Sequence, residues 1–153
     1  MPEQDQGWSR LARRCCLLVA VVMCWQVRDI AEFDFVEFDD GINIVFNLHL
    51  GPWSRDTVVW AFSDMEYMRR YVPVGWMGFS LVYGFSGLSP SGYHMAGAAA
   101  QVASAMLVFA IVLTVLRRSA ASAEVGWRIG GATLAALGWS LHPMRAEAMD
   151  VTD

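Results

Sequence analysis

The stretch Met95–Leu116, MAGAAAQVASAMLVFAIVLTVL, decides the fold class of this chain. It carries no charged residue and is followed directly by Arg117 and Arg118. A run of about 20 apolar residues is long enough to cross the hydrocarbon core of a bilayer as one α-helix. Alanine, glycine and serine fill its first half, and such small residues let helices approach closely in lipid. We therefore predict a transmembrane helix over residues 94–116.

Two further apolar segments, residues 11–30 and 127–143, flank this stretch in the sequence. The composition agrees with a membrane protein, because 56% of the residues are hydrophobic and 17% are charged, against about 25% charged in a soluble domain. A cleaved signal peptide is the alternative for the first segment, but Trp25-Gln26-Val27-Arg28 lacks the small residues of a cleavage site. The sequence thus predicts an all-α integral membrane protein with three transmembrane helices.

The remaining composition excludes some classes of function. Cys15, Cys16 and Cys24 all lie in the first apolar segment without a C-x-x-C spacing, so we interpret them as apolar packing residues. Lysine is absent, the net charge is -4, and no basic stripe is interleaved with aromatic residues. Nucleic acid is therefore excluded as a partner.

The arginines predict the orientation of the three helices. Cytoplasmic segments beside membrane helices are rich in basic residues. This rule places residues 1–10 and 117–126 in the cytoplasm, residues 31–93 in an outer loop, and residues 144–153 in an outer tail. The six arginines that carry the prediction are Arg10, Arg13, Arg14, Arg117, Arg118 and Arg128.

The outer loop is expected to contain two helices, one short and amphipathic and one interfacial. Residues 52–70 read as a short amphipathic helix with Ser54 as its N-cap. Residues 72–87 are apolar and aromatic but broken by glycines. As a fourth span they would move Arg117 and Arg118 to the outer side, so we expect an interfacial or re-entrant helix.

Two polar groups are predicted to share the outer face. One is the adjacent pair Asp39 and Asp40, and the other is the segment from His142 to Glu147 after the third span. Ionisable groups at a membrane mark a functional site by default. Simple alternatives stay open, since Asp-Asp-Gly is a common turn sequence and His-Pro ends helices. Arg145 and Glu147 also fit a surface pair of negligible energy.

A metal site built from the same His, Asp and Glu residues is a further alternative. Their spacing matches no strong ligand pattern, so no metal ligand is assigned. A divalent cation stays open as a cofactor.

Six short motifs follow one another along residues 33–148. In chain order they are Phe38-Asp39-Asp40, Asn47-Leu48-His49, Trp60-Ala61-Phe62, Tyr71-Val72-Pro73-Val74-Gly75-Trp76, Gly87-Leu88-Ser89-Pro90-Ser91-Gly92-Tyr93-His94, and His142-Pro143 with Glu147.

This order of motifs resembles the N-terminal part of a family of integral-membrane glycosyltransferases. They are the GT-C type enzymes related to protein O-mannosyltransferases, including transmembrane proteins that carry tetratricopeptide repeats. Leu48 and Val72 depart from the family pattern, where proline and a polar or basic residue are frequent. Such enzymes have many more spans, so this chain looks like an N-terminal portion or a truncated member.

The resemblance implies transfer of a sugar from a polyprenyl-phosphate lipid to a hydroxyl-bearing protein or glycan on the outer face. Either Asp39 or Asp40 would remove the acceptor proton as general base, and Glu147 would orient the acceptor. The lipid phosphate leaves with negative charge, which cations stabilise. The remaining substrate-binding candidates are His142, Arg145, Arg69, Arg70 and His49.

We expect a bacterial inner membrane location with the active face in the periplasm, because no eukaryotic targeting signal is present. The alternative function is non-enzymatic: a small membrane scaffold or subunit, or an inactive truncated fragment. Small residues along the helices would then pack against partner helices.

Overall fold

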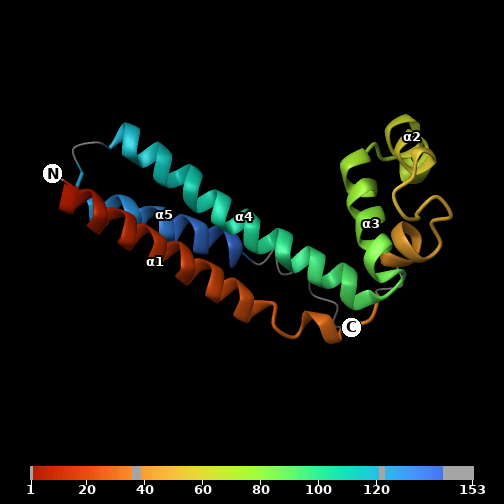
Figure 1. Cartoon of the computed structure of the whole chain (residues 1–153), viewed down its shortest axis with the longest axis horizontal. Coiled ribbons are helices and arrows are strands. Elements are labelled where there is room, and N and C mark those ends of the chain that lie inside the picture. Colours follow the sequence, from red (N-terminus) through yellow and green to blue (C-terminus); the bar gives the residue numbers. More distant parts are fainter. Residues whose placement is uncertain (1, 36–38, 121–122, 143–153) are drawn as a thin grey trace. The chain divides into compact units, whose positions relative to one another are not determined.

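The computed structural model describes residues 2–35, 39–120 and 123–142, and all regular structure in these ranges is helical (Figure 1). The chain divides into two compact units, one formed by residues up to 29 together with those from 98 onward, and one formed by residues 30–97. The long helices are α1 (Pro2–Gln26), α2 (Arg55–Ser63), α3 (Pro73–Ser86), α4 (Pro90–Ser119) and α5 (Val125–Ser140). The predicted all-α fold is confirmed.

One candidate membrane span is present among the described helices, where three were predicted. It is α4, which is 30 residues long and has 17% of its most apolar stretch buried. A helix in the core of a soluble protein would be mostly buried, so this exposure favours membrane association. With 16 residues, α5 measures about 24 Å and is shorter than the roughly 30 Å hydrocarbon core. The first turns of α1 are polar, with Glu3, Gln4 and Asp5.

The helices extend beyond or fall short of their predicted bounds for local reasons. Pro90 begins α4, because proline suits the first position of a helix. The last helix was predicted to reach 143 but ends at Ser140. His142 precedes a proline, and the residue before proline is disfavoured in helical conformation. These differences are confined to the ends of the helices.

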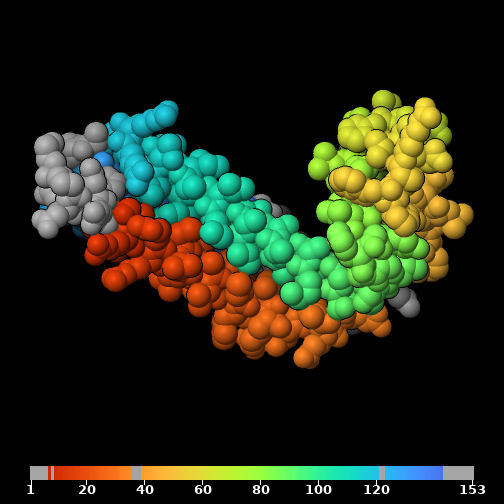
Figure 2. All heavy atoms as spheres, viewed as in Figure 1, coloured from red at the N-terminus to blue at the C-terminus, as the bar shows by residue number. Residues whose placement is uncertain are grey.

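The first unit is held together by a core that α1, α4 and α5 share. Small residues of α5 allow close contact, since a Cβ on Gly131 would lie 3.3 Å from Leu116 Cδ1 of α4. Side chains of α1 and of the C-terminal part of α4 meet along this unit (Figure 2). The buried core residues are Ala12, Val19, Met23, Ala105, Phe109, Leu113, Ile129, Ala132 and Ala136.

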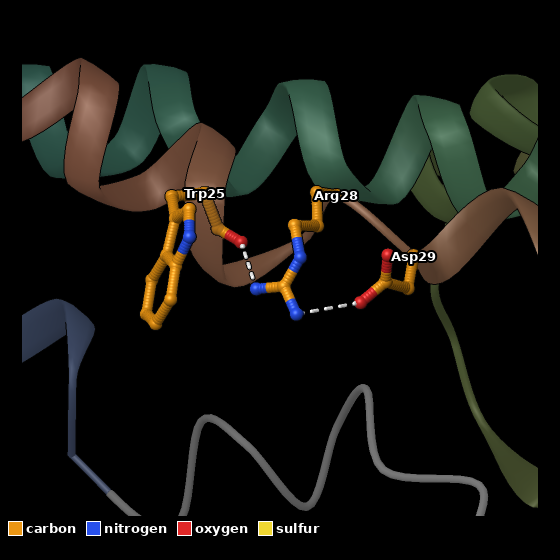
Figure 3. Close-up of polar contacts among 3 residues, drawn as sticks. All are labelled: Trp25, Arg28 and Asp29. Atoms are coloured by element: carbon orange, nitrogen blue, oxygen red, sulfur yellow. Dashed lines mark hydrogen bonds and ion pairs between the residues drawn. The ribbon is translucent and has the colours of Figure 1, made fainter.

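The end of α1 is closed by the side chain of Arg28 (Figure 3). Its Nη1 donates to the carbonyl oxygen of Trp25 at 3.2 Å, and its Nη2 lies 3.0 Å from Asp29 Oδ2. The guanidinium carbon also lies 4.8 Å from the centroid of the Trp25 ring. A terminal helix carbonyl thus gains a partner. The ion pair also neutralises an arginine that falls among the last residues of the predicted first span, 11–30.

The 30–97 unit is built around α2 and α3, which pack against each other. Ser54 caps α2, since its Oγ accepts from the Thr57 backbone N–H at 3.1 Å, as predicted. The predicted helix over 52–70 is shorter than expected. It ends at Ser63 because Asp64 is extended (φ -76, ψ 127), and the Asp64 carboxylate accepts from the Tyr67 N–H at 2.9 Å. A separate 3-10 turn, Tyr67–Arg69, follows.

The predicted helix over 72–87 is present as α3, while its interfacial position stays a prediction. Pro73 occupies its first turn, and Gly87 ends it with φ +59, a conformation that side-chain-bearing residues rarely adopt. The turn into α4 is tight, because a Cβ on Gly92 would lie 2.6 Å from Ser86 Cβ. These two glycines let α3 turn directly into the candidate membrane helix.

Candidate functional site

Four aromatic rings of the 30–97 unit contact one another in stacked, tilted or edge-on pairs. The imidazole of His49 stacks on Trp60, with centroids 4.8 Å apart and an interplanar angle of 10°. Tyr67 and Trp76 lie 5.7 and 5.5 Å from Trp60 and 5.6 Å from each other. Offset and edge-to-face pairs add about 0.5–1.5 kcal/mol each beyond burial. We call these four residues the aromatic cluster.

The aromatic cluster joins segments that are separate in the sequence. Trp60 comes from α2, Trp76 from α3, Tyr67 from the 3-10 turn, and His49 from the loop before α2. The ring contacts continue through Phe79 to the start of α4. They are Trp76–Phe79 at 6.1 Å, Phe79–Tyr93 at 6.1 Å, Phe35–Tyr93 at 5.6 Å and Phe35–His94 at 6.3 Å.

The acidic pair begins a helical turn rather than the simple turn that the sequence left open as an alternative. Asp39 and Asp40 have helical conformation and lead into a π-helix, Gly41–Val45. The Phe46 N–H donates to the Gly41 carbonyl at 2.8 Å, and Asn43 Nδ2 donates to the Asp39 carbonyl at 2.7 Å. Such π-turns are rare and frequently lie at functional sites. The Asp39 side chain is exposed, and that of Asp40 is half-buried.

One hydrogen bond connects this π-turn to the aromatic cluster. The Tyr67 hydroxyl donates to the carbonyl oxygen of Ile42 at 2.7 Å. Burial raises the pKa of Tyr67 above its usual value, because a phenolate is poorly solvated among the rings. The phenol therefore stays neutral and keeps its proton for the bond. The acidic pair and the aromatic cluster thus belong to one connected structure.

Arg69 and Arg70 follow Tyr67 after one intervening residue, Met68, and have exposed side chains. Met68 and Arg69 have φ of 54 and 52°, in the left-handed region. Each such residue costs roughly 1–2 kcal/mol when it carries a side chain. Strain of this kind persists where surrounding contacts impose it. Here Tyr67 is bonded through both its backbone N–H and its hydroxyl.

His49 is positioned from the same π-turn through Asn47. The buried Asn47 side chain donates to the Asn43 carbonyl at 3.3 Å and accepts from the His49 backbone N–H at 3.0 Å. Leu48, which replaces the family's proline, is 96% exposed. Asn47 therefore orients the loop while His49 contributes its ring to the aromatic cluster.

The structure brings five of the eight predicted site residues into one unit: Asp39, Asp40, His49, Arg69 and Arg70. His142 belongs to the other unit, follows α5 and is exposed. Arg145 and Glu147 lie outside the described residues. The predicted meeting of the acidic pair with His142 and Glu147 stays a prediction.

Tyr67, Trp60 and Asn47 are positioning residues that the sequence reasoning missed as parts of the site. Trp60 and Asn47 were seen as members of motifs, but Tyr67 lies in none. No spacing rule could have found it, because Tyr67 reaches Ile42, Trp60 and Trp76 across three separate segments. The signal available was its position two residues before Arg69, the first of the two adjacent arginines.

No group of three or more His, Cys, Asp or Glu side chains in the described part of the chain is arranged to hold a metal ion. A shallow hollow of about 420 Å³ lies at the start of α2. Its lining residues are Trp53, Ser54, Arg55, Val58 and Val59, so the acidic pair does not line it. Comparison of the chain with protein-family profiles, curated proteins and solved structures gives no match.

Proposed function

We propose that this chain is the N-terminal module of a membrane glycosyltransferase, which moves a sugar from a polyprenyl-phosphate donor to a hydroxyl-bearing protein or glycan. The observation that carries the proposal is the hydrogen bond from Tyr67 to Ile42 at 2.7 Å. It joins the segment of the acidic pair to the segment that presents Arg69 and Arg70. The 30–97 unit then supplies both the general base for the acceptor, Asp39 or Asp40, and the cations for the leaving phosphate, Arg69 and Arg70.

The chemistry of these groups suits glycosyl transfer. A carboxylate within reach of an alcohol takes its proton as the hydroxyl attacks the anomeric carbon, and Asp39 or Asp40 fills this role. The bond from that carbon to the donor phosphate breaks, and the phosphate leaves with the bonding electrons. Arg69 or Arg70 stabilises the resulting charge, since guanidinium binds phosphate through two hydrogen bonds. Glu147, Arg145 and His142 complete the site in this proposal.

The membrane arrangement in this proposal has three spans, with α4 preceded by α1 and followed by α5. The 30–97 unit then lies on the outer side, which is the periplasm if the membrane is a bacterial inner membrane. Exposed apolar side chains support contact of all three helices with lipid. Examples are Leu17 and Leu18 of α1, Ile111 of α4 and Leu134 of α5.

The test is an assay of sugar transfer with the protein reconstituted in vesicles that contain polyprenyl-phosphate-linked hexoses. Asp39→Asn, Asp40→Asn and the double variant are compared with Asp56→Asn, an exposed carboxylate on α2. Loss of a general base lowers the rate by about 10²–10⁴-fold. One aspartate variant and the double variant should lose activity to this extent, while Asp56→Asn keeps it.

Unchanged transfer in the double variant would exclude the acidic pair as base. If the chain requires further spans for turnover, crosslinking of a photoactivatable polyprenyl-phosphate donor replaces the assay. Arg69→Gln with Arg70→Gln should weaken that crosslinking, with Arg13→Gln as a control on the other unit. Equal crosslinking in both variants would contradict the proposed phosphate contact.

A non-enzymatic membrane subunit is the second candidate, and an exposed small-residue face on α4 favours it. Ala99 and Ala103 lie one turn apart and are both exposed. Small residues at this spacing support close helix packing in lipid. In that case the double substitution Ala99→Leu with Ala103→Leu would abolish association with a partner helix. Sugar transfer would be undetectable in the wild-type chain and in every variant alike.

A further inference from the structure

The exposed side of α2 is apolar. Val58, Val59 and Phe62 are 38%, 55% and 52% exposed, whereas Thr57 and Ala61 face the interior of the unit. At 100° per residue, Val58, Phe62, Arg55 and Val59 follow one another around about 100° of the helix surface. The polar Asp56 and Ser63 come next, beyond Val59. The helix thus has a continuous apolar arc with one arginine inside it.

Trp53 extends this arc beyond the start of the helix. Its indole N–H donates to the Met77 carbonyl of α3 at 2.9 Å, and its side chain is 59% exposed. The hollow of about 420 Å³ lies between Trp53 and the first turns of α2, with Arg55 as its one charged lining residue. We define the α2 face as Trp53, Arg55, Val58, Val59 and Phe62.

The chain itself indicates what covers the α2 face. The 30–97 unit includes the first residues of α4, from Pro90 to Gly97. With 30 residues, α4 measures about 45 Å, which exceeds a hydrocarbon core of about 30 Å. One end or both ends of α4 must therefore reach the headgroup region. If α4 crosses the bilayer, the 30–97 unit, which contains the first residues of α4, is held next to one membrane surface.

The chemistry of the α2 face matches that surface. Tryptophan is enriched at the membrane–water boundary, because its ring is apolar and its N–H is polar. Arginine buries its methylene groups beside apolar neighbours and extends its charge to phosphate. Each basic residue near an anionic membrane surface adds attraction that salt weakens.

We propose that the α2 face docks onto the lipid bilayer, with Trp53, Val58, Val59 and Phe62 at the acyl boundary and Arg55 on the phosphate of an anionic lipid. This docking goes beyond sugar transfer and does not depend on the acidic pair. It requires that α4 crosses the membrane. A non-enzymatic membrane subunit would have the same docked face.

The test measures the environment of nitroxide labels on single cysteines, in a background with Cys15, Cys16 and Cys24 replaced by alanine. Val58→Cys and Asp56→Cys are the matched pair, because they lie on opposite sides of the exposed part of α2. Leu107→Cys, exposed on α4, reports whether α4 spans the bilayer. The full chain is reconstituted in phosphatidylcholine vesicles with or without phosphatidylglycerol, and accessibility to oxygen and to a water-soluble nickel complex is recorded.

Docking predicts that the labels at 58 and 107 are shifted toward oxygen accessibility and that the label at 56 is shifted toward the nickel complex. Arg55→Gln should shift the label at 58 toward the nickel complex in vesicles with phosphatidylglycerol, and less without it.

Equal nickel accessibility at 58 and 56, with 107 in lipid, overturns the docking alone. A label at 58 shielded from both reagents identifies protein as the covering partner and also overturns it. A label at 107 in water overturns its membrane basis. Sugar transfer in the Asp39→Asn and Asp40→Asn variants is read separately, so failure of the enzymatic proposal is distinguishable.

Discussion

The ring of His49 stacks on the ring of Trp60 with centroids 4.8 Å apart and planes 10° from parallel. This contact fixes the loop that follows the acidic pair against α2. Through Trp60 it also reaches Tyr67 and Trp76. The order of the loop therefore depends on rings contributed by three other segments.

Replacing His49 with alanine should lower the free energy of unfolding of the 30–97 unit by about 1 kcal/mol, the typical value of an aromatic pair. Leu48→Ala is the matched control, because Leu48 is the adjacent residue and its side chain is 96% exposed. Hydrogen exchange of the amides between 47 and 60 measures the effect. Equal exchange in the two variants would show that the stack does not stabilise the loop.

Tyr67→Phe removes the hydrogen bond to the Ile42 carbonyl and keeps the ring. An ordinary hydrogen bond contributes about 0.5–1.5 kcal/mol. We expect faster exchange of the amides from 41 to 46 and, in an active preparation, slower sugar transfer. Tyr71→Phe is the control, since its exposed hydroxyl makes a longer bond of 3.3 Å to Phe62. A similar change in both variants would contradict a specific role of Tyr67.

The ionisation of Tyr67 should make the unit less stable in strong alkali. Its pKa is raised in the folded protein by burial, so the unfolded chain releases this proton first as the pH rises. The contribution of the neutral Tyr67 phenol to the free energy of unfolding is complete below a pH of about 10, the pKa of a free tyrosine. It is lost as the pH rises through the pKa of the folded protein. An ultraviolet titration of phenolate absorbance, compared between wild type and Tyr67→Phe, measures this ionisation. A difference spectrum that titrates at or below the free value would refute the raised pKa.

Arg69→Gly and Arg70→Gly form a pair that isolates backbone strain, because each removes one exposed arginine. Arg69 has φ of 52° and Arg70 has φ of -131°. Glycine relieves roughly 1–2 kcal/mol of strain at a left-handed position but costs about 0.5–1 kcal/mol of chain entropy. Arg69→Gly should therefore be neutral or stabilising and Arg70→Gly destabilising, as judged by thermal unfolding. The opposite order would mean that Arg69 is not strained.

Gly92→Ala should destabilise the turn between α3 and α4, since the new Cβ would lie 2.6 Å from Ser86 Cβ. We expect a loss of about 1–3 kcal/mol, as for other overpacked positions. Ser86→Gly in the same chain should restore part of it. Gly84→Ala, which meets nothing within 4 Å, should stabilise α3 by up to about 1 kcal/mol. Differential scanning calorimetry compares these variants, and equal stability of Gly92→Ala and wild type would contradict the close approach.

Local patterns in the sequence predicted where the long helices lie, but not all of their ends. The charge-free run before Arg117 specified α4, and Ser54 specified the start of α2, because hydropathy and capping act within a few residues. The same reasoning extended α2 too far, to residue 70. It missed that Asp64 leaves the helix to accept from the Tyr67 N–H.

The sequence by itself determined that this chain is helical and that one helix is apolar enough to cross a membrane. It also determined that the acidic pair Asp39 and Asp40 follows the first apolar segment. Tertiary structure decided that Tyr67 bonds to Ile42 and that His49 stacks on Trp60. These contacts join residues 25 and 11 positions apart in the chain. Contacts between separate segments depend on how helices and turns pack, and no periodicity in the chain encodes them.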